Sequence, residues 1–207
     1  MSPASEGPTE AIPAAIHGLL IAGGHGRRAG GPKALIQTAE GLLWRVQVAR
    51  LQQAGCEQVV AVLHPTALPA AAPPGTTLVA AAPDAPMFAS LQLGLATLAT
   101  STPDSPLPVL MLPVDCPMPA MSVTADLLAA VGQVGTAPWQ VARPRHGQRH
   151  GHPLLLAPSF CQLLRQQDPN QARLDRLIAA QPAAQALSVP VADAGILANF
   201  NGDGLRR

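Results

Sequence analysis

The sequence contains no tyrosine, and aromatic residues make up only 2% of its 207 residues. Proteins that hold single-stranded nucleic acid stack its bases on aromatic side chains, which are almost absent here. The formal net charge is +1, whereas proteins that bind the phosphate backbone carry a large excess of positive charge. We therefore expect no nucleic acid among the partners of this protein.

Long apolar runs are also missing. Hydrophobic residues reach 48% and charged residues only 12%, yet no uninterrupted apolar run approaches the roughly 18 residues of a membrane span. Residues 1–14 have neither a basic segment nor an apolar one and contain three prolines. We expect them to be a disordered tail and not a signal peptide, and we expect no membrane partner.

Cysteine is scarce. The three cysteines, Cys56, Cys116 and Cys161, are odd in number and far apart. This spacing indicates reduced thiols in a cytoplasmic protein, and neither a disulfide framework nor a zinc site. The length predicts one domain, over residues 15–207, that is large enough to bury a sizeable core.

A segment rich in glycine and basic residues follows the first apolar run. Ile16–Ala22 predicts a buried strand, and after it come Arg27, Arg28, Lys33 and five glycines (Gly23, Gly24, Gly26, Gly30 and Gly31). Glycine lets the backbone approach a ligand closely, and successive N–H groups then form an anion site. The segment therefore predicts a loop that binds polyphosphate; the alternative is a solvated surface turn.

This segment is not a Walker loop, because Ala34 stands after Lys33 where Ser or Thr is required. The dinucleotide pattern G-x-G-x-x-G fits only in its loosest form, with Ala29 in place of the last glycine. The weak dinucleotide match stays open at this point.

Apolar runs and helix-like periodicity alternate along the rest of the chain. We expect strands at 16–22, 59–63, 78–81, 109–112, 140–142, 154–157 and 187–191, and helices at 42–54, 88–99, 122–131, 159–165 and 173–180. This alternation predicts an α/β fold with a mostly parallel sheet covered by helices on both faces. Ligands of such folds lie beyond the carboxyl ends of the strands. The 23–33 loop, Asp84 and Asp115 should therefore converge at one edge.

Asp115 stands at the end of an expected strand, in a stiff Pro113-Val-Asp-Cys-Pro117 frame. Mg²⁺ takes one or two protein carboxylates together with substrate phosphates and water. Asp115 opposite a phosphate loop therefore predicts a magnesium ligand, and the alternative is a capping residue at a turn.

A second basic segment covers residues 143–152, with three arginines and three histidines. It predicts a clamp for an anionic acceptor. A solvated hairpin and metal binding by the histidines are the alternatives.

Several stretches, in order along the chain, resemble one family. Residues 20–33 resemble the L-x-[GA]-G-x-x-x-R-M-G-x-x-K signature of nucleotidyltransferases, and residues 113–117 resemble the P-x-D-x-P metal motif. Weaker likenesses lie at 88–95 (S-L-x-x-G-L), 151–154 (H-P-[LV]) and 197–201 (the terminal N-x-N). Together they resemble the molybdenum cofactor nucleotidyltransferases, the MobA-like guanylyl- and cytidylyltransferases of molybdopterin.

The resemblance implies a single-domain Rossmann-like fold of the GT-A type. It also implies Mg²⁺-dependent transfer of a nucleoside monophosphate from a nucleoside triphosphate to the phosphate of molybdopterin. It assigns the nucleotide to Ile21, Ala22, Gly23, Gly24 and Asp84, and the triphosphate to Arg28 and Lys33. It assigns the metal to Asp115 and Asn201. Within the basic segment 143–152, His152 and Arg149 are the expected contacts of the acceptor.

The sequence departs from the family pattern at three places: Ala29 replaces a methionine, Val62 replaces an asparagine that touches the nucleoside, and the segment after Asn199 is shortened. Ala22-Gly23-Gly24 favours GTP, whereas residues 28–33 and 151–153 favour CTP, and we expect GTP. The alternatives are transfer to a sugar phosphate on the same nucleotide site and a degenerate nucleotide-binding protein without activity.

Overall fold

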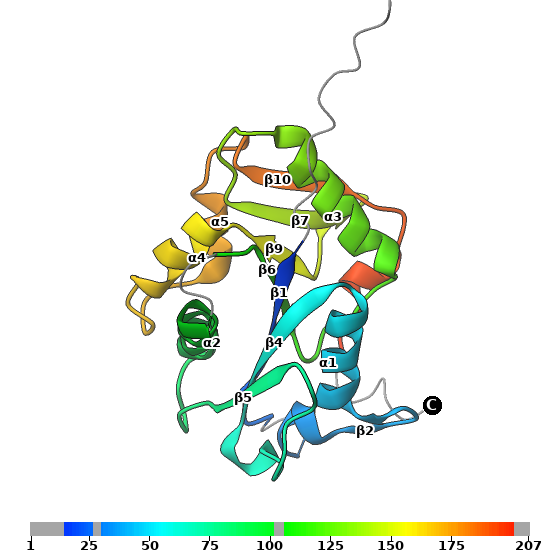
Figure 1. Ribbon diagram of the computed structural model, residues 1–207, viewed down its shortest axis with the longest axis vertical. Helices are drawn as coiled ribbons and strands as arrows, with labels where there is room; N and C mark the ends of the chain where they lie inside the picture. The colour runs from blue at the N-terminus through cyan, green and yellow to red at the C-terminus, as the bar shows by residue number, and fades with distance from the viewer. Residues whose placement is uncertain (1–14, 27–29, 102–105, 201–207) are drawn as a thin grey trace, which may run out of the picture.

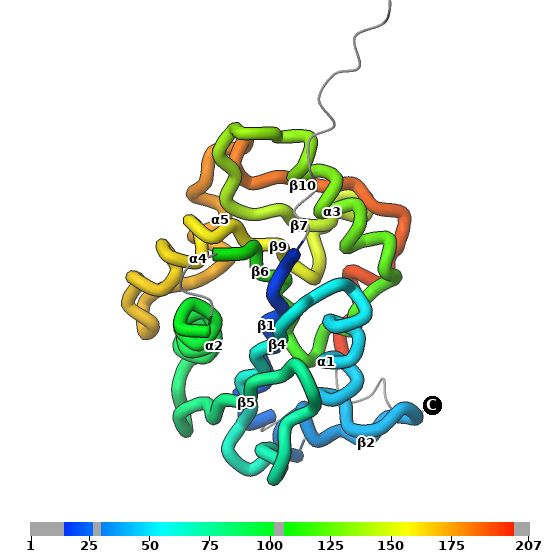
Figure 2. Tube along the Cα trace, viewed as in Figure 1, coloured from blue at the N-terminus to red at the C-terminus, as the bar shows by residue number. Residues whose placement is uncertain are grey.

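The computed structural model describes residues 15–26, 30–101 and 106–200. In this part of the chain one sheet of eight strands runs in the order β10–β7–β9–β6–β1–β4–β5, with β8 paired to β7. Its strands are β1 (Ile16–Ala22), β4 (Cys56–Leu63), β5 (Thr76–Ala80), β6 (Val109–Pro113), β7 (Val141–His146), β8 (Arg149–His150), β9 (Leu154–Leu156) and β10 (Ala186–Pro190). Figure 2 shows β10 and β5 at opposite ends of this sheet.

Helices cover both faces of the sheet (Figure 1). They are α1 (Leu43–Gln53), α2 (Met87–Ser101), α3 (Met121–Val134), α4 (Pro158–Arg165) and α5 (Leu174–Ala179). One half of the core packs against α1 and α3, around the fully buried Trp44, and the other half packs against α2, α4 and α5, around Phe160. In the described residues no helix combines the length and the apolar character needed to cross a bilayer.

The directions of the strands decide which loops meet. Strands β1, β4, β5 and β6 are parallel neighbours, so their carboxyl ends share one edge. β9 runs antiparallel to both β6 and β7, which makes β7 parallel to β6. The carboxyl end of β7 and the start of β9 therefore lie at the same edge as the ends of β1 and β6. This geometry brings residues 143–152 to the edge where Asp115 follows β6.

The predicted α/β fold with a mostly parallel, doubly covered sheet is confirmed, and every expected strand and helix is present. The largest difference is β7, which continues through His146 instead of ending at Ala142. The sequence predicts a loop for the basic residues after Ala142. In the structure Arg143 and Pro144 are part of the strand and pair with Ser188 and Val189 of β10.

The structure contains two hairpins, of which only the second was considered in the sequence analysis, as an alternative. Residues after the glycine-rich segment form a two-stranded hairpin of β2 (Gln37–Thr38) and β3 (Gly41–Leu42). The basic segment 143–152 forms the β7–β8 hairpin, which agrees with the hairpin alternative for that segment. Neither hairpin has the alternating apolar pattern from which strands are recognised.

Helix α2 approaches the sheet closely at Gly94. A Cβ atom at this position would overlap with Leu19 of β1 and would lie 3.0 Å from Cγ2 of Val62 in β4. Val62 is fully buried in this contact. The position where the family pattern has an asparagine is thus part of the core here, and its side chain faces α2 and not a ligand.

Candidate active site

The glycine-rich segment turns back on itself before Lys33. The N–H of Gly31 donates to the carbonyl of Gly26 at 3.2 Å, and Gly26 has φ +59°. A Cβ atom on Gly26 would overlap with the carbonyl oxygen of Gly31, so no other residue fits the turn. Arg27, Arg28 and Ala29 lie outside the described residues, and the role expected for Arg28 remains a prediction.

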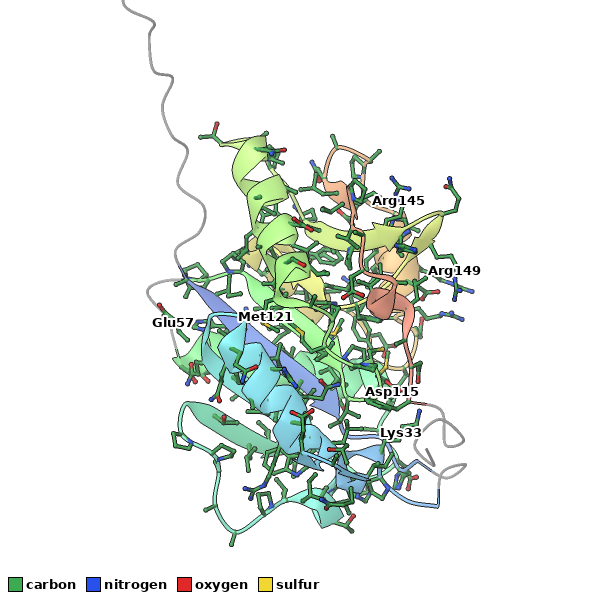
Figure 3. The ribbon with its side chains drawn as sticks, turned by 90° about the vertical axis from the view of Figure 1, so that its right-hand side faces the viewer. Lys33, Glu57, Asp115, Met121, Arg145 and Arg149 are labelled. Carbon is green, nitrogen blue, oxygen red and sulfur yellow. The ribbon has the colours of Figure 1, made fainter. Side chains whose placement is uncertain are left out.

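Lys33 begins a short 3₁₀ helix, η2 (Lys33–Leu35), and its side chain reaches the end of β6. Its Nζ lies 2.9 Å from Oδ2 of Asp115, with side-chain exposures of 23% and 29% (Figure 3). The two motifs that the sequence separates by 82 positions therefore form one half-exposed ion pair. A lysine that binds phosphate and a carboxylate that binds the metal ion of the same nucleotide would have to lie this close together.

Cys116, beside Asp115, stays a neutral thiol. Burial, reinforced by the negative charge of Asp115, raises its pKa to about 12, although Lys33 opposes the shift. The thiol lies 4.0 Å from Oδ1 of Asp115. Because only the thiolate binds metals and attacks electrophiles, Cys116 contributes packing to the site and no chemistry.

Gln47 of α1 holds the segment that carries Asp115. Its amide Nε2 donates to the carbonyls of Val114 at 3.2 Å and Cys116 at 2.7 Å, and its Oε1 accepts from the N–H of Met118 at 3.1 Å. The side chain is only 2% exposed. Sequence analysis missed this residue. The one available signal was a polar side chain on the apolar face of α1, three residues after Trp44.

The last described segment closes the site from the other side. It contains η4 (Ala194–Leu197), whose Ile196 carbonyl accepts from the N–H of His152 at 3.0 Å. A Cβ atom on Gly151 would overlap with that same carbonyl. The N–H of Phe200 donates to the carbonyl of Asp115 at 2.6 Å. Asn201, the second metal ligand expected from the resemblance, lies outside the described residues.

Asp193 anchors the same segment. Its carboxylate accepts hydrogen bonds from the N–H groups of Ala120 at 2.8 Å and Gly195 at 2.7 Å. These two bonds lower the pKa of Asp193 below its ordinary value. The segment is therefore fixed to the start of α3, directly after the Asp115 frame.

Asp84 follows β5 and faces His25 of the glycine-rich loop. Its φ of +58° lies in the left-handed backbone region, which aspartate tolerates better than most residues. Nε2 of His25 lies 3.2 Å from Oδ1 of Asp84 and 3.1 Å from its backbone nitrogen. The other ring nitrogen of His25 lies 3.1 Å from Nε2 of His64, which follows β4. Asp84 thus ties the loop to the end of β5; the sequence did not indicate its contact with His25.

The residues expected to line the base lie at the end of β1. Ile21 and Ala22 are buried, and their carbonyls accept from the N–H groups of Val114 and His64. At Gly23 a Cβ atom would lie 2.6 Å from Cβ of Ala81, whereas Gly24 is exposed with open space around it. The carbonyls of Ile21 and Ala22 thus each accept a hydrogen bond from a neighbouring strand end, which fixes the end of β1 beside the starts of the loops at 64 and 114.

His152 and Arg149, expected to bind the acceptor, lie in different places. His152 lines a cavity of about 700 Å³ that Asp115 also lines. Burial lowers its pKa, although the charge of Asp115 partly opposes this shift. Arg149 is exposed on the β7–β8 hairpin, apart from the Lys33–Asp115 pair (Figure 3). It does not line the cavity.

The described residues include no group of three or more His, Cys, Asp or Glu side chains that could hold a metal ion. This finding does not support metal binding by the histidines of residues 143–152. It is compatible with an ion held by one carboxylate and by substrate phosphates, which is the arrangement that Mg²⁺ prefers.

Solved structures share this fold. Rv0371c from Mycobacterium tuberculosis H37Rv is 20% identical, with 85% of this chain and 87% of that chain covered and a TM-score of 0.67. A manganese complex of Rv0371c matches at 18% identity over 85% and 88%, with a TM-score of 0.65. Mth528, a nucleotidyl transferase from Methanothermobacter, is 18% identical over 90% and 91%, with a TM-score of 0.66.

A cytidylyltransferase, IspD from Francisella tularensis, aligns at 12% identity over 92% of this chain and 96% of its own, with a TM-score of 0.59. At these identities the likeness establishes the nucleotidyltransferase-like fold. A search of curated proteins found no match. The sequence pattern of the MobA-like NTP transferase domain, in contrast, matches residues 18–186, which is most of the chain. The protein therefore belongs to the MobA-like NTP transferase family of nucleotidyltransferases.

Proposed function

We propose that this protein transfers a nucleoside monophosphate from a nucleoside triphosphate to the phosphate of a molybdopterin-type acceptor and releases pyrophosphate. GTP is the expected donor, with CTP as the alternative. The observation that carries the proposal is the contact between Lys33 and Asp115 at the carboxyl edge of the sheet. Membership of the family supplies the reaction type, and the contact joins the phosphate loop to the metal motif.

Mg²⁺ is the proposed cofactor, and the residues fit it. Asp115 offers one half-exposed carboxylate, and Mg²⁺ completes its shell with waters and phosphates. Asn201 is the proposed second ligand. The structure of Rv0371c with manganese is compatible with a divalent ion in this fold. When bound, the ion would neutralise charge on the phosphates as pyrophosphate departs.

The chain's own residues position the reactants. An oxygen of the acceptor phosphate forms a bond to the α-phosphorus, and the bond from that phosphorus to the bridging oxygen breaks. Its electron pair leaves with pyrophosphate, so no protein nucleophile is needed. Lys33 and Arg28 hold the triphosphate, and residues 21–24 with Asp84 hold the nucleoside. His152 and Arg149 are the proposed acceptor contacts.

Pyrophosphate release tests the proposed reaction. The pure protein with Mg²⁺ and molybdopterin should release pyrophosphate from GTP, and more slowly from CTP. The GTP complex should also show the larger rise in melting temperature, since ligand stabilisation follows RT ln(1 + [L]/Kd). A larger rise with CTP would reverse the base assignment. If pyrophosphate is released only with a sugar phosphate, the acceptor is a sugar phosphate and not molybdopterin. If no acceptor leads to pyrophosphate release, the protein binds nucleotide without catalysing transfer.

Lys33→Ala should weaken nucleotide binding about ten-fold or more, because it removes a charge-assisted hydrogen bond to phosphate. Calorimetry with GTP and CTP measures this loss. Arg50→Ala is the control, because it removes a cation that pairs with Glu40 on the exposed side of α1. Unchanged affinity in Lys33→Ala would contradict the phosphate-loop assignment.

Lys33 is also the only lysine in the sequence. Bound nucleotide should therefore protect this single side chain from an amine-specific acylating reagent. Mass spectrometry of the peptide that contains Lys33 measures the protection without relying on a variant.

A further inference from the structure

A cluster of polar side chains joins three loops at the carboxyl edge of the sheet. His25 lies in the glycine-rich segment after β1, His64 directly follows β4, and Asp84 follows β5. The three strands are parallel neighbours in the order β1–β4–β5, so the loops after them start side by side. One ring nitrogen of His25 lies near His64 and the other lies near Asp84. His25 therefore connects the first half of the glycine-rich loop to both neighbouring loops.

This bridge does not depend on where the ring protons lie. With the proton of His25 on Nδ1, its Nε2 accepts from the N–H of Asp84 at 3.1 Å, and Nδ1 donates to Nε2 of His64 at 3.1 Å. With the proton on Nε2, that nitrogen donates to Oδ1 of Asp84 at 3.2 Å, and Nδ1 accepts from His64. Nδ1 of His64 then uses Oγ1 of Thr66 at 2.8 Å in the first case and the N–H of Thr66 at 3.3 Å in the second. The ring of His25 is thus oriented from both sides in either tautomer.

Asp84 has a backbone conformation that needs support. Among the described residues it is the one non-glycine residue with a positive φ, +58°. Such conformations cost energy and persist where the surroundings hold them. The side chain of Asp84 is 70% exposed, so burial supplies little of that support. His25 contacts both the backbone nitrogen and the carboxylate of Asp84, and so it helps to fix the residue that the proposed function assigns to the nucleoside.

The same side chain fixes the start of the glycine-rich loop. Gly26, the next residue, closes the turn by accepting from the N–H of Gly31. At the far end of the loop Lys33 contacts Asp115 after β6. The loop is therefore attached by side chains at both ends, through His25 to the ends of β4 and β5 and through Lys33 to the end of β6. A loop that is ordered before its ligand arrives binds more tightly, because less of the binding energy is used to order it.

We propose that His25 is a positioning residue of the nucleotide site. It holds Asp84 and the first half of the glycine-rich loop in place relative to each other before nucleotide binds, and it takes no part in the transfer itself. The inference rests on the proposed function for the identity of the ligand, and it adds a residue at a position that the nucleotidyltransferase signature leaves free. The contact with Asp84, more than the contact with His64, sets the nucleotide affinity, since Asp84 is the proposed nucleoside contact.

Two substitutions of His25 separate its two contacts. Glutamine places its amide near Nε2 of the histidine, where it can donate to the carboxylate of Asp84 and accept from the N–H of the same residue. Asparagine is shorter and places its amide near Nδ1, so it keeps the contact with His64 and loses the one with Asp84. Calorimetry of the full chain with Mg²⁺, using GTP and then CTP, measures the effect. His25→Gln should bind nucleotide within about two-fold of the unchanged protein, and His25→Asn about five-fold more weakly.

Two controls exclude a general effect of His25→Asn. The melting temperature of the variant without ligand should fall by no more than about 3 °C, because the side chain of His25 is 35% exposed. A larger fall would show that His25 stabilises the fold, and it would overturn the proposal. His146→Asn makes the same change in β7, where the ring lies 3.2 Å from the carbonyl of Val191. It should leave the nucleotide affinity within about two-fold.

A double variant tests whether His25 acts through Asp84. In an Asp84→Ala background, His25→Asn should weaken binding by less than about two-fold further, because its partner has already been removed. An undiminished five-fold loss in that background would overturn the proposal. So would equal affinities of His25→Asn and His25→Gln.

The positioning role and the proposed reaction fail in different experiments. Nucleotide binding that weakens in Lys33→Ala and not in His25→Asn would keep the nucleotide site and reject the role of His25. His25-dependent binding without pyrophosphate release from any nucleotide would keep that role and reject the transfer reaction. Where pyrophosphate is released, His25→Asn should raise KM for the nucleotide and leave kcat within about two-fold. A fall in kcat at unchanged KM would reject the positioning role.

Discussion

Asp115→Asn should lower turnover by on the order of 10²-fold or more, the effect seen when one preorganised electrostatic contact is lost. Asparagine keeps the size of the side chain and one acceptor oxygen, but it removes the negative charge proposed to hold Mg²⁺. The fold should survive, because the Asp115 side chain is 29% exposed and the frame is held through backbone groups. Nucleotide should still bind, since Lys33 loses its competing partner.

Two measurements separate this effect from a general loss of charge. Steady-state pyrophosphate release gives the turnover, and a Mn²⁺ titration by electron paramagnetic resonance gives metal binding in the presence of GTP. Asp126→Asn makes the same charge change on the exposed side of α3 and should leave both unchanged. Near-normal turnover in folded Asp115→Asn would mean that Asp115 is only a cap at the turn after β6.

Gln47→Leu should lower the free energy of unfolding by about 3 kcal/mol, because it removes the partner of three backbone groups, two of them buried and one partly buried. These groups are the carbonyls of Val114 and Cys116 and the N–H of Met118. They flank Asp115, so the change should also displace the carboxylate. We expect kcat to fall and KM for the nucleotide to change little, since Lys33 remains.

Urea unfolding and steady-state kinetics measure the two effects of Gln47→Leu. The control is Gln52→Leu on the same helix, whose Nε2 donates to the carbonyl of Pro74 at 2.7 Å in an exposed place. Water can replace that bond, so the control should lose less than about 1 kcal/mol and keep its turnover. Equal losses in the two variants would show that Gln47 has no special part in holding the Asp115 frame.

The fold was predictable because its central strands, such as β1, β6 and β9, are buried on both faces and therefore appear as apolar runs. Ile16–Ala22 was predicted residue for residue. The meeting of the glycine-rich loop with Asp115 followed from a rule about parallel sheets, which places the ends of β1 and β6 at one edge. The strand could be predicted from neighbouring residues in the sequence. The meeting of the loop with Asp115 could be predicted from the direction of the strands alone.

The features that escaped prediction depend on distant parts of the chain. Gln47 contacts residues 67 and 69 positions away, and nothing near it in the sequence marks it as a support for Asp115. Arg143 and Arg149 are equivalent in the sequence, as two of three arginines in one basic segment. Only the fold separates them, because Arg143 lies in β7 and lines the cavity, whereas Arg149 lies exposed in β8 of the hairpin.

Residues 191–200 follow the last strand of the sheet, so the ribosome synthesises them after every strand. Lys33 and Asp115 are synthesised early and in the middle of the described chain, and the sheet that joins them needs no residue after Pro190. The hydrogen bonds that Phe200 donates to Asp115, His152 to Ile196 and Ala120 to Asp193 can form only afterwards. The edge at Asp115 is therefore completed by residues that are synthesised after every strand of the sheet.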